Sequence, residues 1–182
     1  MAFNIKGRLS FEHIFTPSAT EGSEPTFSCS VLMLKGSAEV KKVEAEMMRV
    51  ATEKWGAKGK EVLARLIKGG KTCLRDGDTK EYDGYAGMDY VTARNPVQPS
   101  AFDKNGEETE KADGLIYSGC YVQARIELWA QDNKYGRRIN AKLLGVKFEK
   151  DGDAFASGSG PAKATDFDVD DEPSDDGKKP WE

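Results

Sequence analysis

The stretch GLIYSGCYVQARIELWAQ, residues 114–131, decides the fold, because it alternates like a long β-strand with two different faces. One face is small or apolar and suits the interior of a barrel: Ile116, Ser118, Cys120, Val122, Ala124, Ile126, Leu128 and Ala130. The other face carries aromatic rings and an arginine: Leu115, Tyr117, Gly119, Tyr121, Gln123, Arg125, Glu127 and Trp129. The pattern predicts a strand that packs a core on one side and presents rings on the other.

Four further strands are predicted from alternation and from the turn residues that bound them. The predicted strands are residues 3–15, 26–35, 88–94, 114–131 and 137–148. The last two form a hairpin across residues 132–136. In the first strand Phe3, Ile5, Leu9 and Phe11 fall on the buried side.

A helical block interrupts the strands after residue 35. Ser37 is a suitable N-cap, and apolar residues then recur at three- and four-residue spacing as far as Trp55. A second short helix ends at Gly69 and Gly70. The result is a mainly β protein with a helical insertion, and we expect an OB-like small antiparallel barrel. A β-sandwich is the alternative, but it would normally show more strands and no helical block.

The last part of the chain differs in charge from the rest. Residues 151–182 contain ten acidic residues and three lysines, whereas residues 1–150 contain 21 acidic and 24 basic residues. The tail is rich in Gly, Ser, Pro and Asp, so it lacks the apolar surface that would offset the entropy of ordering it. We expect one OB-like domain at 1–150 and a disordered acidic tail at 151–182. A tail of this charge can compete with a polyanion for the basic body.

Composition excludes several classes of protein. The sequence has no apolar run long enough to span a membrane, and its first residues do not resemble a signal peptide, which indicates a cytoplasmic protein. Cys29, Cys73 and Cys120 form no CxxC pair and His13 is the single histidine, so neither a zinc site nor a cofactor is expected. Buried or idle thiols are the simplest interpretation of the cysteines.

Catalytic arrangements are not apparent. One histidine near the N-terminus provides no Ser/His/Asp or Cys/His set, so we predict no enzyme activity. An acidic cluster could hold Mg²⁺ as a nuclease would, although acidic residues beside glycine are also ordinary turn formers. Its members are Asp76, Asp78, Glu81, Asp83 and Asp89.

Basic residues occur in two different settings. The helical block carries lysines and arginines interspersed with glutamates, which is typical of a solvated face with ion pairs along the helix. The loop Lys68–Lys71 could contact phosphate but is not a P-loop, because the full motif is absent. On the strands, basic residues are interleaved with aromatic rings.

This interleaving favours nucleic acid. Same-face residues on a strand are about 6.5–7 Å apart, so rings can each stack on a base while basic side chains pair with phosphates. The alternative is that the rings pack under the helices or form a subunit interface, but the core of such an interface would be depleted of lysine. The candidate nucleic-acid-binding residues are Tyr90, Arg94, Tyr117, Tyr121, Arg125, Trp129, Arg137, Arg138 and Lys142.

Three segments carry a family resemblance: YVTARNP at 90–96, IYSGCYV at 116–122, and the strand-turn-strand that ends in Val146-Lys147-Phe148. Together they resemble phage-encoded single-stranded DNA-binding proteins with an OB fold. The resemblance implies cooperative coating of single strands in phage replication, recombination or repair, in the host cytoplasm and without catalysis. It implies DNA contacts at the matched positions Tyr90, Arg94, Tyr117 and Tyr121.

Single-strand binders commonly end in an acidic segment with an aromatic residue near the tip, which recruits replication partners. Here Asp175 and Asp176 precede Trp181, so the resemblance implies replication or recombination proteins as partners of the tail. The sequence leaves open duplex DNA or RNA as further ligands, and a homo-oligomer or a cooperative array on DNA. The competing hypothesis is a protein-interaction or virion-assembly module that uses the aromatic face as a subunit interface.

Overall fold

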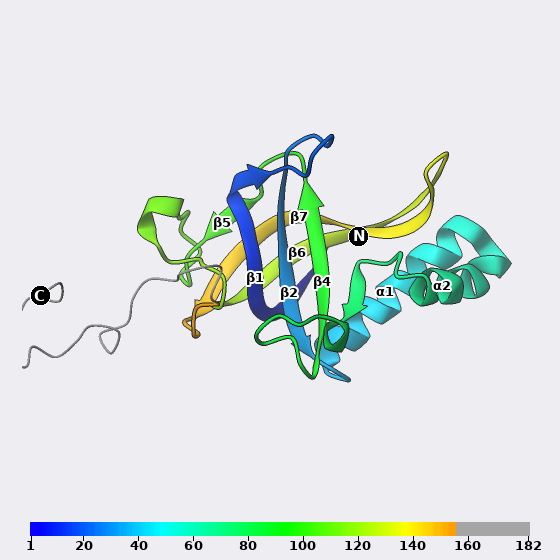
Figure 1. The fold of residues 1–182 in the computed structure, drawn as a ribbon, viewed down its shortest axis with the longest axis horizontal. Helices are drawn as coiled ribbons and strands as arrows, with labels where there is room; N and C mark the ends of the chain where they lie inside the picture. The colour runs from blue at the N-terminus through cyan, green and yellow to red at the C-terminus, as the bar shows by residue number, and fades with distance from the viewer. Residues whose placement is uncertain (156–182) are drawn as a thin grey trace, which may run out of the picture.

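Five long strands close into a barrel (Figure 1). They are β1 (Phe3–Ser18), β2 (Thr26–Leu34), β4 (Met88–Asn95), β6 (Tyr121–Asn133) and β7 (Gly136–Lys150). Around the barrel the order is β1-β2-β4-β7-β6 and back to β1. The structure is a computed structural model, and it describes residues 1–155. Neighbours are antiparallel except β4 and β7, which run parallel where Arg94 pairs with Lys142. This is the five-stranded Greek-key barrel of the OB fold, as predicted.

Two short strands extend the sheet. β3 (Leu74–Asp76) pairs with β4, and β5 (Ser100–Phe102) pairs with β7. The sequence predicted no strand in either segment. Each has only three residues, which is too short for a periodic pattern to be visible in the sequence.

The interior face predicted for β6 is confirmed. Val122, Ala124, Ile126 and Leu128 are buried and alternate with the more exposed residues between them. The predicted start of this strand is wrong, because Gly114–Cys120 form an irregular loop and pairing begins at Tyr121. Gly119 has a φ of +114°, which extended L-residues do not adopt and which interrupts the strand.

The predicted position of Phe11 on the buried side of β1 is also wrong. The pairing of β1 with β2 shifts between Ser10 and His13, and Phe11 there has a φ of +48°. A bulge adds a residue and reverses the faces that follow it. As a result Leu9 and Ile14 both point into the core while Phe11 is 45% exposed.

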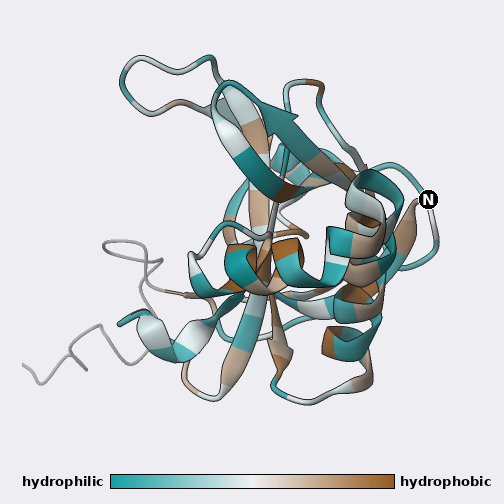
Figure 2. Cartoon of the chain, turned by 90° about the vertical axis from the view of Figure 1, so that its right-hand side faces the viewer, coloured by the Kyte–Doolittle hydropathy of each residue, from teal (hydrophilic) through white to brown (hydrophobic). Residues whose placement is uncertain are grey.

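The helical insertion lies between β2 and β3 and consists of α1 (Ala38–Trp55), a 3-10 turn (Gly56–Lys58) and α2 (Gly59–Lys68). Ser37 caps α1 as predicted, since its hydroxyl accepts a bond from the Val40 amide at 3.4 Å. Figure 2 shows that the helices carry both polar and apolar residues. Their buried apolar residues belong to the same hydrophobic core as the barrel interior. At the end of α1 the Trp55 indole donates to Asp132 at 2.9 Å, which ties the helices to the β6–β7 hairpin.

The three cysteines are free and buried, which agrees with their interpretation as core residues. Burial raises the pKa of Cys29 and of Cys73 to about 12 and that of Cys120 to about 11. Neither helix in residues 1–155 has the length and continuous apolar character needed to cross a membrane.

Beyond β7, residues 151–155 pack back onto the barrel. Arg8 donates to the carbonyls of Gly119 (3.0 Å) and Asp153 (2.5 Å), and its guanidinium lies 4.0 Å from the ring centroid of Phe155. The Phe155 amide donates to the Ser118 carbonyl at 3.0 Å. The end of the described chain is therefore fixed beside Gly119. The tail residues singled out in the sequence, Asp175, Asp176 and Trp181, lie outside the described residues.

Candidate nucleic-acid interface

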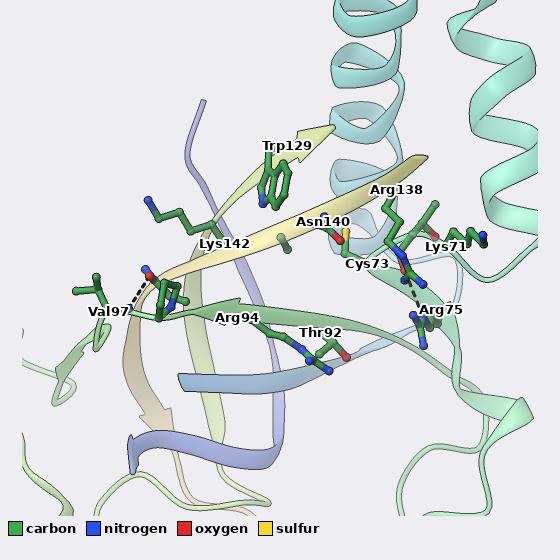
Figure 3. A pocket seen from close by; sticks show the side chains of 14 residues that line it. Lys71, Cys73, Arg75, Thr92, Arg94, Val97, Trp129, Arg138, Asn140 and Lys142 are labelled. Atoms are coloured by element: carbon green, nitrogen blue, oxygen red, sulfur yellow. Dashed lines mark hydrogen bonds between the residues drawn. The ribbon is translucent and has the colours of Figure 1, made fainter. Parts of the chain in front are cut away.

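A groove of about 610 Å³ crosses the outer face of the barrel where β4, β6 and β7 meet the segment 71–75 (Figure 3). Trp129 lies on one side of the groove and is 46% exposed. Five cationic side chains line it: Lys71, Arg75, Arg94, Arg138 and Lys142. No Asp or Glu among residues 1–155 contributes to its lining. The groove therefore combines positive charge with an accessible ring.

Strand register brings the β-strand members together. Arg94 of β4 is paired with Lys142 of β7 at the parallel contact that closes the barrel. Trp129 is paired with Asn140 across the β6–β7 hairpin, and Arg138 lies two residues further along the same face of β7. The groove residues on β6 and β7 thus follow from one hairpin, whereas Arg94 depends on barrel closure.

Lys71 and Arg75 reach the groove by a different route. The segment between α2 and β3 bridges β7 and β4, because the Ile139 amide donates to the Lys71 carbonyl and the Thr92 amide donates to the Cys73 carbonyl, both at 3.1 Å. Arg75 is oriented by a 3.3 Å bond from its Nε to the Thr72 carbonyl. The backbone of this segment holds both side chains at the rim of the groove.

The groove cations are free of carboxylate partners. No Asp or Glu of the described chain forms a salt bridge with Lys71, Arg75, Arg94, Arg138 or Lys142. Their charge is therefore available to an external anion. In a concave site such charges reinforce one another and attract polyanions.

A second hollow of about 260 Å³ continues the groove over β1, β2 and β4. It shares Thr92 and Arg94 with the first, so the two form one surface. Its lining is aromatic and hydroxylic and, among the described residues, contains no Asp or Glu: Phe11, His13, Ser18, Ser28, Cys29, Ser30, Tyr82, Tyr85, Tyr90, Thr92 and Arg94. We call the first hollow the cationic end and the second the aromatic end.

The rings at the aromatic end have unequal access to solvent. Tyr90 is on the same face as Arg94, as predicted, but it is only 5% exposed because Tyr85 packs on it with ring centroids 5.2 Å apart. The Tyr85 hydroxyl donates to Ser10 at 2.9 Å, and burial raises the pKa of Tyr85. Phe11 and Tyr82 are 45% and 51% exposed. The accessible rings are therefore Phe11 and Tyr82.

The structure brings together five of the nine residues predicted from the sequence. Arg94, Trp129, Arg138 and Lys142 line the cationic end, and Tyr90 lies beneath the aromatic end. Tyr117, Tyr121, Arg125 and Arg137 line neither hollow.

Each of these four has a different environment. The Tyr117 hydroxyl lies 2.9 Å from both Asp151 Oδ1 and the Gly152 carbonyl and donates to them. Tyr121 packs against Gly152 so closely that a Cβ at that position would lie 2.9 Å from its ring. Arg125 donates to Asn4 Oδ1 at 3.1 Å. Arg137 lies 3.3 Å from Asp132 and is stacked over Trp55. The prediction of one continuous stripe of rings along 114–131 is wrong, since that segment is not one strand.

Sequence reasoning missed Phe11, Tyr82 and Arg75. The bulge that exposes Phe11 reverses the face that alternation had assigned to it, and Tyr82 and Arg75 lie in a segment with little regular signal. Lys71 was anticipated as part of a phosphate-contacting loop. Its position beside two strands could not be foreseen from the loop alone.

Two members of the predicted acidic cluster, Asp76 and Asp78, form salt bridges with a neighbouring lysine. The Lys35 ammonium lies 2.5 Å from carboxylate oxygens of both Asp76 and Asp78 and holds the pKa of each below its usual range. Asp78 also accepts the Gly87 amide at 2.8 Å. Within residues 1–155 no group of three or more acidic, histidine or cysteine side chains is arranged to hold a metal ion. These carboxylates pin a turn to the end of β2.

An OB barrel with an acid-free groove of cations and accessible rings defines a class of protein suited to hold a polyanion with exposed flat groups. The particular family follows from the sequence. The chain belongs to the family described as the single-stranded DNA-binding protein of Enterobacter phage Enc34, whose profile matches residues 3–177. The resemblance found in the sequence is thereby confirmed.

Individual phage proteins are also similar to this chain. Protein p50 of Acyrthosiphon pisum secondary endosymbiont phage 1 is 39% identical over 165 residues, which cover 88% of this chain and 89% of p50. The single-stranded DNA-binding protein of bacteriophage Enc34, solved in complex with single-stranded DNA, is 29% identical with a TM-score of 0.73, covering 85% of this chain and 89% of that one. Protein gp2.5 of bacteriophage T7 shares the fold, with a TM-score of 0.60 at 12% identity and coverage of 88% and 98%.

Proposed function

We propose that this protein binds single-stranded DNA in the groove, without strong sequence preference and without catalysis. The observation that carries the proposal is the set of five unpaired cations beside Trp129 in a groove that no described carboxylate lines. The groove lies over β4, the third barrel strand, and continues onto β2, the second. This is the face on which OB folds bind oligonucleotides.

Physical chemistry favours a single strand over other anions. Lysine and arginine neutralise phosphates whatever the sequence, and aromatic rings stack on any base because every base has a flat face. A duplex hides those faces inside its stack. The rings at both ends of the groove would therefore contribute only to an unpaired strand.

The family to which the chain belongs supports this assignment, since it is described by a single-stranded DNA-binding protein. The relative solved with single-stranded DNA matches 85% of this chain. By this proposal the protein coats unwound phage DNA in the host cytoplasm during replication, recombination or repair. A protein-interface core would be depleted of lysine, and the groove contains two.

We also propose that the acidic tail recruits replication or recombination proteins, through Asp175, Asp176 and Trp181, and competes with DNA for the groove. The point of departure of the tail supports the competition. Phe155 lines a hollow together with Phe11, Tyr82 and Tyr85, so the chain leaves the described part beside the aromatic end. By this proposal the acidic tail begins next to the surface that we assign to DNA.

The test is fluorescence anisotropy of a labelled oligo-dT, titrated with the full chain and with a variant that lacks 156–182, beside a matched duplex. This deletion keeps residues 151–155, which pack on the barrel. We expect salt-sensitive binding to the single strand, weaker binding to the duplex, and tighter binding at low salt after the deletion. Absence of single-strand binding in both proteins would refute the proposal.

A further inference from the structure

We propose that Phe11 and Tyr82 form a stacking subsite for one unpaired nucleobase at the aromatic end of the groove. The inference rests on the proposed function and deepens it. It assigns base contact to two residues that lie away from the predicted stripe. It also separates a base-holding end of the groove from a phosphate-holding end.

The first observation is the exposure of the pair. The rings of Phe11 and Tyr82 are edge-to-face, with centroids 5.0 Å apart and an interplanar angle of 74°. About half of each residue is exposed, 45% and 51% respectively. Two large rings that contact one another yet keep so much surface in water provide an incomplete aromatic cluster, and a flat base can complete it.

The second observation is the backbone that presents Phe11. A φ of +48° is uncommon for a residue with a Cβ, and Phe11 is the only non-glycine residue of the described chain with positive φ. The conformation is held by its neighbours, since the Glu12 amide donates to the Ser118 hydroxyl at 3.0 Å and the Ile14 amide donates to Glu12 at 2.8 Å. Such outliers, where the surroundings enforce them, concentrate at functional sites.

The third observation is that buried rings support the exposed pair from beneath. Tyr82 contacts Tyr85 with centroids 5.3 Å apart, and Tyr85 contacts Tyr90 of β4 at 5.2 Å. Tyr85 is buried and its hydroxyl is bonded to Ser10. The exposed pair is thus connected to the barrel through packed rings, so a base stacked on it would meet a preorganised surface.

The charges around the pair orient a nucleotide. Arg94 lines the same hollow as Phe11 and Tyr82, and from Arg94 the surface continues into the cationic end. Glu12 and Asp83 line the adjoining hollow, which Arg94 does not line, and their carboxylates would repel phosphate there. The base therefore lies at the rings and its phosphate toward Arg94.

The experiment combines protein variants with abasic DNA. Affinity for oligo-dT is measured for the full chain and for F11A, Y82A and the control Y135A, whose ring is 74% exposed at the β6–β7 turn and lies in neither hollow. We expect F11A and Y82A each to weaken binding between about 5- and 150-fold, the range for one stacked base. Y135A should change binding by less than about twofold, because its ring is not in the groove.

An abasic nucleotide is then placed in turn at each position of the shortest oligo-dT that keeps full affinity, on which the protein has a single register. At one position, and there alone, the loss caused by Y82A should disappear, because the base that stacked on the ring is already missing. The salt dependence should keep its slope, because no phosphate contact is removed. Tyr82 lies in a loop and is 51% exposed, so we expect Y82A to fold. The test therefore remains valid if F11A fails to fold.

The outcomes separate this inference from the proposed function. Normal binding by F11A and Y82A, with loss of binding in R94A/R138A, overturns the subsite and leaves the groove intact. An equal loss at every abasic position would show that the rings act through the fold, and also overturns it. Failure of all variants to alter binding would overturn both proposals.

Discussion

Two surfaces of this protein are rich in lysine and arginine, and they differ in whether their arginines are paired with carboxylates. The helical insertion carries eight basic residues between Ala38 and Lys68, and the groove is lined by five. On the helices Arg49 contacts Glu46 at 2.7 Å and Glu53 at 2.6 Å. Lys42 contacts Glu39 at 3.1 Å, and Arg65 pairs with Glu61. Among the described residues, the groove cations have no such partners.

The difference teaches that the number of basic residues does not locate a polyanion site. A helix-surface cation paired with a glutamate three or four residues away adds little net field. In the described residues none of the five groove cations forms a salt bridge, so their fields add. Each phosphate neutralised there releases condensed counterions from DNA.

The largest effect is expected from R94A/R138A. Each side chain lost removes a charge-assisted contact worth about 1.5–3 kcal/mol, so affinity for oligo-dT should fall by roughly 100-fold or more. The slope of log affinity against log salt should become shallower by about 0.7 for each phosphate contact removed. Anisotropy titrations at several salt concentrations measure both. An unchanged slope would show that these arginines do not contact phosphate.

Trp129 should rank second. Loss of one stacked ring in W129A should weaken binding by about 5- to 150-fold, while W129F keeps a ring and should recover much of the loss. The difference in tryptophan quenching by oligo-dT between the unmodified protein and W129F isolates the signal of Trp129 from that of Trp55 and Trp181. Equal affinities for W129A, W129F and the unmodified protein would remove Trp129 from the site.

Arg125 tests the sequence pattern against the structure. It lies outside both hollows and donates to Asn4, so R125A should weaken binding by less than about threefold. R138A, measured in parallel, should lose far more. The reverse order would mean that DNA follows the β1–β6 side of the barrel rather than the groove.

The smallest effect is expected on the helices. R49A/R65A removes the same charge as R94A/R138A, but because both arginines are paired with glutamates its affinity should change by less than about twofold. The comparison is charge-matched, so long-range attraction alone cannot explain a difference. Equal losses in the two double variants would contradict the distinction between paired and unpaired cations.

Local pattern predicted much of this fold. Alternation identified the interior face of β6, the spacing of apolar residues identified α1, and the cap at Ser37 was placed correctly. These features depend on near neighbours in the chain. Alternation also placed Arg94 and Trp129 on the outer face of their strands, whereas Arg138 and Lys142 were predicted only as basic residues of the last hairpin.

The remainder depends on contacts between distant segments. The bulge at Phe11 and the interruption at Gly119 occur together, since the Gly119 amide donates to the Leu9 carbonyl at 2.7 Å. Arg75 enters the groove only because residues 71–75 fill the space between β4 and β7. No period in either segment records such a contact, so the stripe predicted over 114–131 contained residues that the structure separates.

Phe11 has a further consequence for the evolution of this chain. Its backbone conformation suits glycine, and a side chain held there is expected to lower the free energy of unfolding by about 1 kcal/mol or more. F11G would relieve that strain but would also remove the ring contacts with Tyr82 and Tyr85, so stability alone gives no reason to keep or to replace the residue. Position 11 therefore marks a trade-off between a relaxed backbone and an exposed ring.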